Sequence, residues 1–76
     1  MRMKYYIIYK IVRDEEGQVI DLINTWEEKS QEMASNWLGV DRHLINRAII
    51  TRANDKQMNE TTPIRARGGE WLVMRG

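Results

Sequence analysis

The chain has 76 residues, 42% of them hydrophobic and 30% charged, which is enough for one small domain with a modest core. It contains no cysteine, and this excludes disulfide bonds and thiolate metal sites. No apolar run is long enough to span a membrane, and the Met1-Arg2-Met3 opening has no signal-peptide pattern. We therefore expect a cytoplasmic protein without membrane contact.

The chain as a whole is almost neutral, but its two halves carry opposite excess charge. Twelve Lys and Arg stand against eleven Asp and Glu, a formal net charge of +1. Residues 1–39 carry five basic and seven acidic side chains, whereas residues 40–76 carry seven basic and four acidic. Any contact with phosphate groups is therefore expected in the second half.

The first predicted element is a β-hairpin over residues 4–23. Residues 5–12 are rich in β-branched and aromatic side chains, the polar turn 14–17 ends in glycine, and the strand pattern resumes at Val19. Alternation divides the first strand into two apolar faces: Tyr5, Ile7, Tyr9 and Ile11 on one, and Tyr6, Ile8 and Val12 on the other.

Two helices cannot cover both faces of that strand at once. A second copy of the chain could cover the face of Tyr6, Ile8 and Val12, so we expect a homodimer through the sheet or the C-terminal strand. The alternative is that Tyr5 and Tyr9 lay their rings flat on the sheet and keep their hydroxyl groups in water.

A helix, a turn and a second helix are predicted next, over residues 26–52. Ser30 can cap the first helix, although a capping box from Thr25 to Glu28 would start it at Trp26. Ala34 and Leu38 lie one helical turn apart, and Gly39 suits the positive φ at which a helix ends.

The second helix is predicted over residues 41–52, with Asp41 as its cap. Its apolar side carries Leu44, Ile45, Ala48 and Ile49. The opposite side carries Arg42, His43, Asn46 and Arg47, which is the donor-rich surface that reading of DNA base edges requires.

Residues 54–69 are predicted to form a loop, because residues 54–62 are polar and aperiodic and Pro63 disfavours a helix past it. Residues 70–75 read as a strand, with Trp71 and Val73 opposite Leu72 and Met74. The predicted fold is α+β: an N-terminal hairpin, a helix-turn-helix pair, and a C-terminal strand that returns to a small antiparallel sheet. We expect residues 1–76 to form a single helix-turn-helix domain whose helices cover one face of the sheet.

Residues 39–49 resemble the turn and recognition helix of bacterial helix-turn-helix proteins. With Ser30, Ala34, Trp37 and Leu38, and with Gly68-Gly69-Glu70-Trp71 behind them, they are similar to the modular DNA-binding repeat found beside homing-endonuclease catalytic domains. Residues 4–10 also resemble the first strand of small phage proteins that place a hairpin before a helix-turn-helix. The resemblance implies sequence-specific binding to double-stranded DNA by a phage or mobile-element transcriptional regulator.

In that interpretation Arg42 and Asn46 face base edges, while His43 and Arg47 contact bases or phosphates. The DNA backbone is expected to be contacted by Thr51, Arg52 and Arg65, and by Arg67 if Arg65 and Arg67 line a flexible wing. The simpler alternative is that these polar groups are a solvated helix face and the charges of an edge strand.

No catalytic or metal constellation can be assembled from the sequence. His43 is the only histidine, and the Glu15-Glu16 and Glu27-Glu28 pairs point their members apart. We therefore expect no enzyme activity, no cofactor and no metal. A second hypothesis for function is a protein-interaction module on the same fold, such as a phage-encoded inhibitor of a host defence or polymerase complex, with a host protein as its partner.

Overall fold

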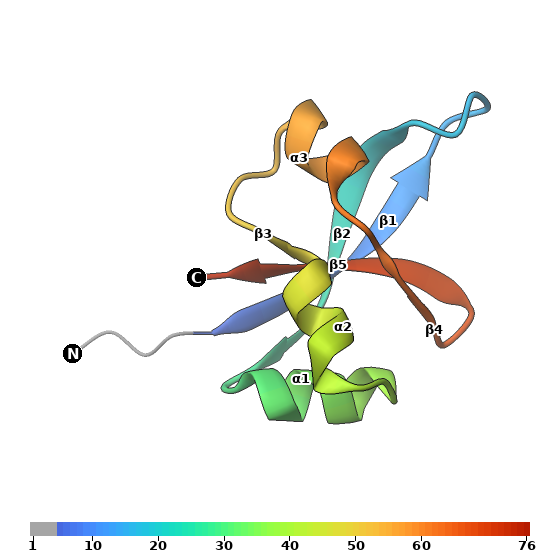
Figure 1. The fold of residues 1–76 in the computed structure, drawn as a ribbon. Coiled ribbons are helices and arrows are strands. Elements are labelled where there is room, and N and C mark those ends of the chain that lie inside the picture. The colour runs from blue at the N-terminus through green and yellow to red at the C-terminus, as the bar shows by residue number, and fades with distance from the viewer. Residues whose placement is uncertain (1–4) are drawn as a thin grey trace.

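The structure is a computed structural model that describes residues 5–76 as a small α+β domain (Figure 1). Five strands and three helices follow one another in the order β1 (Tyr6–Arg13), β2 (Val19–Glu28), α1 (Gln31–Leu38), α2 (Arg42–Arg47), β3 (Ile49–Ile50), α3 (Asp55–Glu60), β4 (Ile64–Ala66) and β5 (Gly69–Arg75). None of the helices in the described residues is long and apolar enough to cross a membrane.

The predicted hairpin is present, but its second strand is longer than predicted. β1 and β2 pair antiparallel from Arg13↔Val19 to Tyr6↔Glu28. The run from Ile23 to Trp26 therefore continues the strand, and Trp26 does not begin a helix; the Thr25–Glu28 capping box is wrong. β-branched and aromatic side chains favour a strand over a helix. Pairing with β1 therefore extends β2 as a strand as far as Glu28. The predicted start at Lys4 lies outside the described residues.

β5 returns to the sheet antiparallel to β1, as predicted, with Ile8 opposite Val73. It then becomes the centre of a larger sheet than predicted. Its other edge pairs first with β4, antiparallel, and then with β3, which runs parallel to it. The C-terminal strand consequently has neighbours on both edges and offers no free edge to a second copy.

Two predictions for the second half of the chain are corrected. The second helix ends at Arg47 rather than at residue 52, because Ile49 and Ile50 leave it to pair with β5. The predicted loop contains α3, whose cap Asn54 accepts a hydrogen bond from the Gln57 N–H at 2.9 Å. Both had a signal in the sequence: a β-branched run at residues 49–51, and an Asn followed three residues later by Gln.

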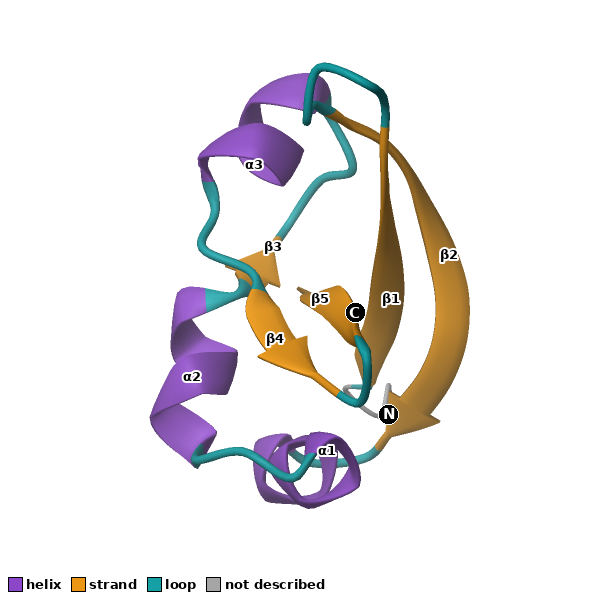
Figure 2. Ribbon diagram, turned by 90° about the vertical axis from the view of Figure 1, so that its right-hand side faces the viewer, coloured by secondary structure: helices purple, strands orange, loops and turns teal. Residues whose placement is uncertain are grey.

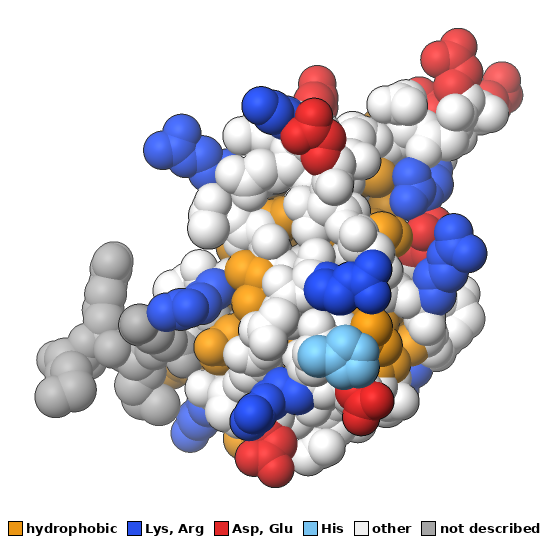
Figure 3. All heavy atoms as spheres, viewed as in Figure 1, with side chains coloured by type: hydrophobic (Ala, Val, Ile, Leu, Met, Phe, Trp, Pro, Cys, Tyr) orange, Lys and Arg blue, Asp and Glu red, His pale blue; other side chains and the backbone are white. Residues whose placement is uncertain are grey.

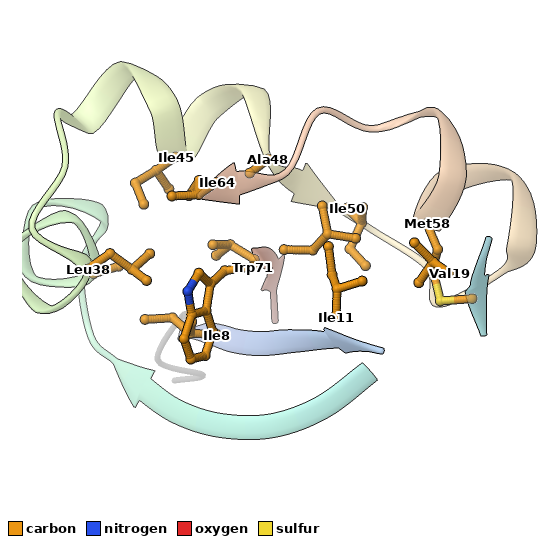
Figure 4. Close-up of a cluster of buried hydrophobic side chains, with 13 residues drawn as sticks. Ile8, Ile11, Val19, Leu38, Ile45, Ala48, Ile50, Met58, Ile64 and Trp71 are labelled. Atoms are coloured by element: carbon orange, nitrogen blue, oxygen red, sulfur yellow. The ribbon is translucent and has the colours of Figure 1, made fainter. Parts of the chain in front are cut away.

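The helices lie on the concave side of the curved hairpin, as Figure 2 shows, with α1 and α3 at its opposite ends. This agrees with the prediction that the helices cover one face. The core between the layers is an elongated row of side chains (Figure 4) made of Ile8, Ile11, Val19, Ala34, Leu38, Ile45, Ala48, Ile50, Met58, Ile64, Trp71, Leu72 and Val73.

The second apolar face predicted for β1 is not an uncovered surface. Ile8 is fully buried within a single chain, and Tyr6 packs against the same core. Ile11 is buried as well, although simple alternation places it on the face opposite Ile8. Side chains from both faces of β1 are therefore covered within one chain. The extra residue of the β1–β2 register shift between Ile8 and Tyr9 is Thr25 in β2, so this shift does not change the alternation of β1. A dimer formed through Tyr6, Ile8 and Val12 would have no Ile8 surface to bury.

Candidate nucleic-acid interface

The candidate site is built on α1, the turn after it, and α2. α1 begins where the Ser30 Oγ accepts a hydrogen bond from the Met33 N–H at 3.1 Å. This cap satisfies one of the backbone donors left free at a helix start. The predicted start after Ser30 is therefore confirmed, in preference to the start at Trp26.

Gly39 ends α1 in the left-handed conformation, with φ 73°, as predicted. The Gly39 and Val40 N–H groups both donate to the Ser35 carbonyl oxygen, at 2.8 and 3.0 Å. These bonds close the last turn of α1 and turn the chain sharply into α2.

Asp41 occupies the cap position of α2, but its side chain makes no capping hydrogen bond. Only its backbone takes part, because the Asp41 carbonyl accepts from the Leu44 N–H at 3.0 Å. The prediction that the Asp41 carboxylate caps α2 is therefore wrong, and the helix begins with a backbone hydrogen bond instead.

The two helices sort their side chains cleanly into an inner and an outer set. Ala34, Leu38, Ile45 and Ala48 are buried, and in Figure 4 Ile45 lies beside Ile64 of β4. On α2 the exposed residues are the four predicted for its outer side: Arg42, His43, Asn46 and Arg47. Figure 3 shows the histidine with basic side chains above and to its lower left and an acidic side chain directly below it.

Gln31 adjoins the exposed face of α2 and is not among the residues predicted for this face. Its side-chain amide donates to the Asn46 Oδ1 and, at 3.3 Å, to the Arg42 carbonyl oxygen. It therefore ties the first turn of α1 to the outer face of α2 and orients the Asn46 amide. Only the crossing of the helices brings residues 31 and 46 together, so no local sequence signal could have shown the pair.

Three arginines of the surface have no carboxylate within ion-pair distance. Among residues 5–76 the ion pairs are Arg13–Glu70 and Arg65–Glu70, which leaves the guanidinium groups of Arg42, Arg47 and Arg52 unpaired. Unpaired, exposed guanidinium groups are free to approach an anion without first breaking a salt bridge.

Thr51 and Arg52 lie in the turn after β3, not on the second helix. The Gln57 Oε1 accepts from both of their N–H groups, at 2.8 and 3.1 Å. α3 thereby holds this turn in place while both side chains stay exposed.

The two arginines predicted to form a wing behave differently from each other. The Arg65 side chain is 84% exposed, with its Nε 3.8 Å from a Glu70 oxygen, so it extends from β4 into solvent. The guanidinium of Arg67 instead lies 4.0 Å from the centre of the Trp37 ring, and its Nη1 donates to the Trp37 carbonyl at 3.0 Å. Arg67 is therefore exposed but held against Trp37, and a contact of either arginine with DNA stays a prediction.

Arg67 also has an unusual backbone. It is the one non-glycine residue with positive φ among those described, at 50°, and Gly68 follows at 72°. Together they form the two-residue turn between β4 and β5, in which the first position normally favours Asn, Asp or Gly. The contacts with Trp37 offset the strain of placing an arginine there.

Behind the surface the three tryptophans form one cluster. Trp37 stacks on Trp26, with 5.6 Å between ring centres and 10° between planes, and meets Trp71 edge-on at 5.6 Å. The buried Trp71 indole donates to the Ala66 carbonyl at 2.7 Å. The cluster joins β2, α1 and β5 and so fixes the position of α1 against the sheet.

The strongest electrostatic contact lies away from α2. Arg13 donates to both oxygens of Glu70, at 2.8 and 3.0 Å. These hydrogen bonds hold the pKa of the Glu70 carboxyl below its ordinary value. They join the outer end of the hairpin to the start of β5.

In the part of the chain that the structure describes, no three His, Asp or Glu side chains are grouped so that they could hold a metal ion. Comparisons with models of known protein families, with curated proteins and with solved structures found no match to this chain.

Proposed function

We propose that this chain is a helix-turn-helix protein that binds double-stranded DNA and reads it with α2. The observation that carries the proposal is the sorting of side chains on two helices joined by a tight glycine turn. Ala34, Leu38 and Ile45 face inward, while every polar side chain of α2 faces solvent. A helix that enters the major groove needs this exposed, donor-rich face on a rigid support.

The residues divide by chemistry into readers and anchors. Arg42 pairs best with guanine and Asn46 with adenine, because each can make two hydrogen bonds to one base edge. His43 and Arg47 contact bases or phosphates from the same face. Thr51, Arg52 and Arg65, on neighbouring segments, contact the backbone and set the register of the protein on the duplex, as phosphate contacts generally do.

Gln31 has a positioning role in this proposal. Its contact with the Asn46 Oδ1 holds the amide in one orientation before DNA arrives. A bidentate contact with adenine uses both the oxygen and the nitrogen of Asn46, so the Gln31 bond must open or be shared on binding.

Binding to random duplex DNA at two salt concentrations, about 50 and 200 mM, tests the proposal. Each phosphate contact releases counterions, so we expect affinity to fall steeply, by about tenfold or more for a few contacts. Arg47→Ala should reduce this salt dependence, whereas Arg75→Ala, an exposed arginine at the end of β5, serves as the matched control. No binding at low salt would refute the proposal.

A protein-interaction module on the same fold is the second candidate. Two observations favour it: the net charge is only +1, and Arg67 is engaged by Trp37. Both reduce the number of phosphate contacts that one chain can make. Under this alternative the surface of α2 would dock on a host protein, and duplex DNA would show no binding even at low salt.

A further inference from the structure

β2 is a long strand with one unpaired edge. It forms one end of the sheet order β2-β1-β5-β3, so β1 is its only strand neighbour among the described elements. It spans ten residues, Val19–Glu28, with no Pro, Lys or Arg. Pro and Lys are residues that proteins commonly place on edge strands to prevent pairing with another chain; β2 instead carries three carboxylates and two register shifts.

The same strand carries three of the large apolar side chains that the structure leaves exposed. Ile20 is 58% exposed, Ile23 50% and Trp26 46%. Their positions are symmetric in the sequence, because Ile20 and Trp26 each lie three residues from Ile23; the pairing of β2 with β1 shifts register once on each side of Ile23, at Ile20 and at Thr25. A pattern that is symmetric about its own centre is what a twofold interface between identical chains requires.

We propose that two copies of this chain associate through antiparallel pairing of their β2 edges, about a twofold axis at Ile23. In this arrangement Ile23 lies next to its own copy. Trp26 of each chain comes close to the Ile20–Asp21 segment of the other. The exposed apolar side chains of both copies are covered by one another, which supplies the burial that a 76-residue domain lacks.

The charges on β2 agree with this register. Its acidic residues, Asp21, Glu27 and Glu28, all lie away from the axis. Counting outward from Ile23, Asp21 meets Thr25 of the other copy, whereas Glu27 and Glu28 lie beyond the paired residues Ile20–Trp26. No carboxylate is placed directly opposite another, so the arrangement avoids the like-charge pairs that destabilise neighbouring strands.

Side-chain hydrogen bonds define where the pairing stops. The Val19 N–H donates to the Asn59 Oδ1 at 2.8 Å, and the Asn59 amide donates to the Val19 carbonyl at 3.4 Å. Asn59 thus replaces a partner strand at this end, and pairing begins at Ile20. At Leu22 the N–H donates to the Asp21 Oδ1 at 2.8 Å, and this carboxylate must turn away, toward Thr25 of the other copy, when the edges pair.

This inference is independent of DNA binding, and sedimentation equilibrium of the protein alone tests it. We expect the mass to rise with concentration from 9.1 kDa to about twice that value. Ile23→Lys should return the mass to that of one chain, whereas Met33→Lys, at an equally exposed apolar position on α1, should leave the association unchanged. Circular dichroism of each variant establishes that it is folded.

Cross-linking tests the position of the axis. The chain has no cysteine, so Ile23→Cys introduces a single thiol. Directly opposite positions have Cβ atoms about 4.5–5.5 Å apart, close to disulfide geometry. Under mild oxidation Ile23→Cys should form covalent dimer at least tenfold faster than Ile20→Cys, the control on the same strand.

Three outcomes would overturn the inference. One is a mass that stays at 9.1 kDa at all concentrations. Another is an association that Ile23→Lys leaves intact, which would place the contact between copies elsewhere. The third is equal cross-linking of the two cysteine variants, which would show that the strands do not meet at Ile23.

Discussion

At the scale of single residues, the polar groups of α2 differ from those around them in being exposed and largely uncommitted. Arg42 and Arg47 have no ion-pair partner in residues 5–76, whereas Arg13 is fully engaged by Glu70 and Arg67 by Trp37. All four residues are arginines, so the residue type alone does not predict which of them are paired. It depends on whether an acidic or aromatic side chain lies within reach in the folded chain.

For the reading residues we predict that Arg42→Ala and Asn46→Ala each weaken binding to a specific DNA site by ~1–3 kcal/mol. Arg42→Ala should change the free energy of unfolding by no more than about 0.5 kcal/mol, because its side chain is exposed. Asn46→Ala should cost up to about 1 kcal/mol, because it also removes the hydrogen bond from Gln31, but the domain should stay folded. Titration with duplex DNA and urea unfolding of each variant measure the two effects. Loss of the fold in either variant, or unchanged binding in both, would mean that the reading face is assigned incorrectly.

For Glu70 we predict a contribution to stability that disappears in acid. Because the pKa of Glu70 is lower in the folded chain than in the unfolded one, the carboxylate stabilises the fold above its unfolded pKa of about 4.5. That contribution is lost as the pH falls below this value through the folded pKa. The urea midpoint should therefore drop less between pH 7 and pH 3 in Glu70→Gln than in the unmodified protein.

Glu60→Gln is the matched control for that experiment. Glu60 is an exposed carboxylate at the end of α3 and has no ion pair among the described residues. Its substitution should leave the dependence of the urea midpoint on pH close to that of the unmodified protein. An equal change in both variants would contradict the role assigned to the Arg13–Glu70 contact.

At the scale of elements, the ends of the helices determine where the site lies. α1 starts at a serine cap and stops at a left-handed glycine, and both signals are local. α2 stops after only six residues because the next segment is taken into the sheet as β3. The reading helix is therefore short, and Thr51 and Arg52 support it from a separate turn held by α3.

The turn between α1 and α2 should depend on the conformation of Gly39. Nothing lies within 4 Å of the position that a Cβ would occupy there, so a substitution creates backbone strain but no clash. We predict that Gly39→Val lowers the free energy of unfolding by ~1–2 kcal/mol, and that Gly39→Asn costs less because Asn tolerates positive φ. Urea unfolding measures both, and a Gly39→Val variant as stable as the unmodified protein would be inconsistent with the observed turn.

At the scale of the whole molecule, contacts between distant segments hold the layers together. β5, at the end of the chain, is the central strand, with β1 on one edge and β3 and β4 on the other. The tryptophan cluster joins three elements in the same way, since its members come from β2, α1 and β5. Such a small domain should unfold in one cooperative step, because the central strand and the tryptophan cluster join segments from both ends of the chain.

Trp37 is the central member of the cluster, and its replacement should cost more than that of Trp26. Trp37 contacts two aromatic rings and the Arg67 guanidinium, whereas Trp26 stacks on Trp37 alone and is partly exposed. Summing about 0.5–1.5 kcal/mol for each aromatic pair and about 0.5–1 for the cation, Trp37→Leu should lower the free energy of unfolding by ~2–3 kcal/mol. Trp26→Leu should cost about 1 kcal/mol, and equal losses in urea unfolding would contradict the central place of Trp37.

Interactions between residues that are near one another in the chain are enough to predict the local structure. The hairpin, the cap at Ser30, the turn at Gly39 and the exposed side of α2 follow from backbone preferences and from the spacing of apolar residues. Each depends on interactions between residues that are near one another in the chain, so each can be read without knowledge of the fold.

The tertiary structure alone decided which elements meet. Local sequence patterns do not predict the length of β2, the parallel pairing of β3 with β5, the Gln31–Asn46 contact or the contact of Arg67 with Trp37. Each of these depends on hydrogen bonds or packing between segments that lie far apart in the chain. Local preference at such positions is weaker than the free energy gained by pairing a strand or burying an apolar face, so packing determines the outcome.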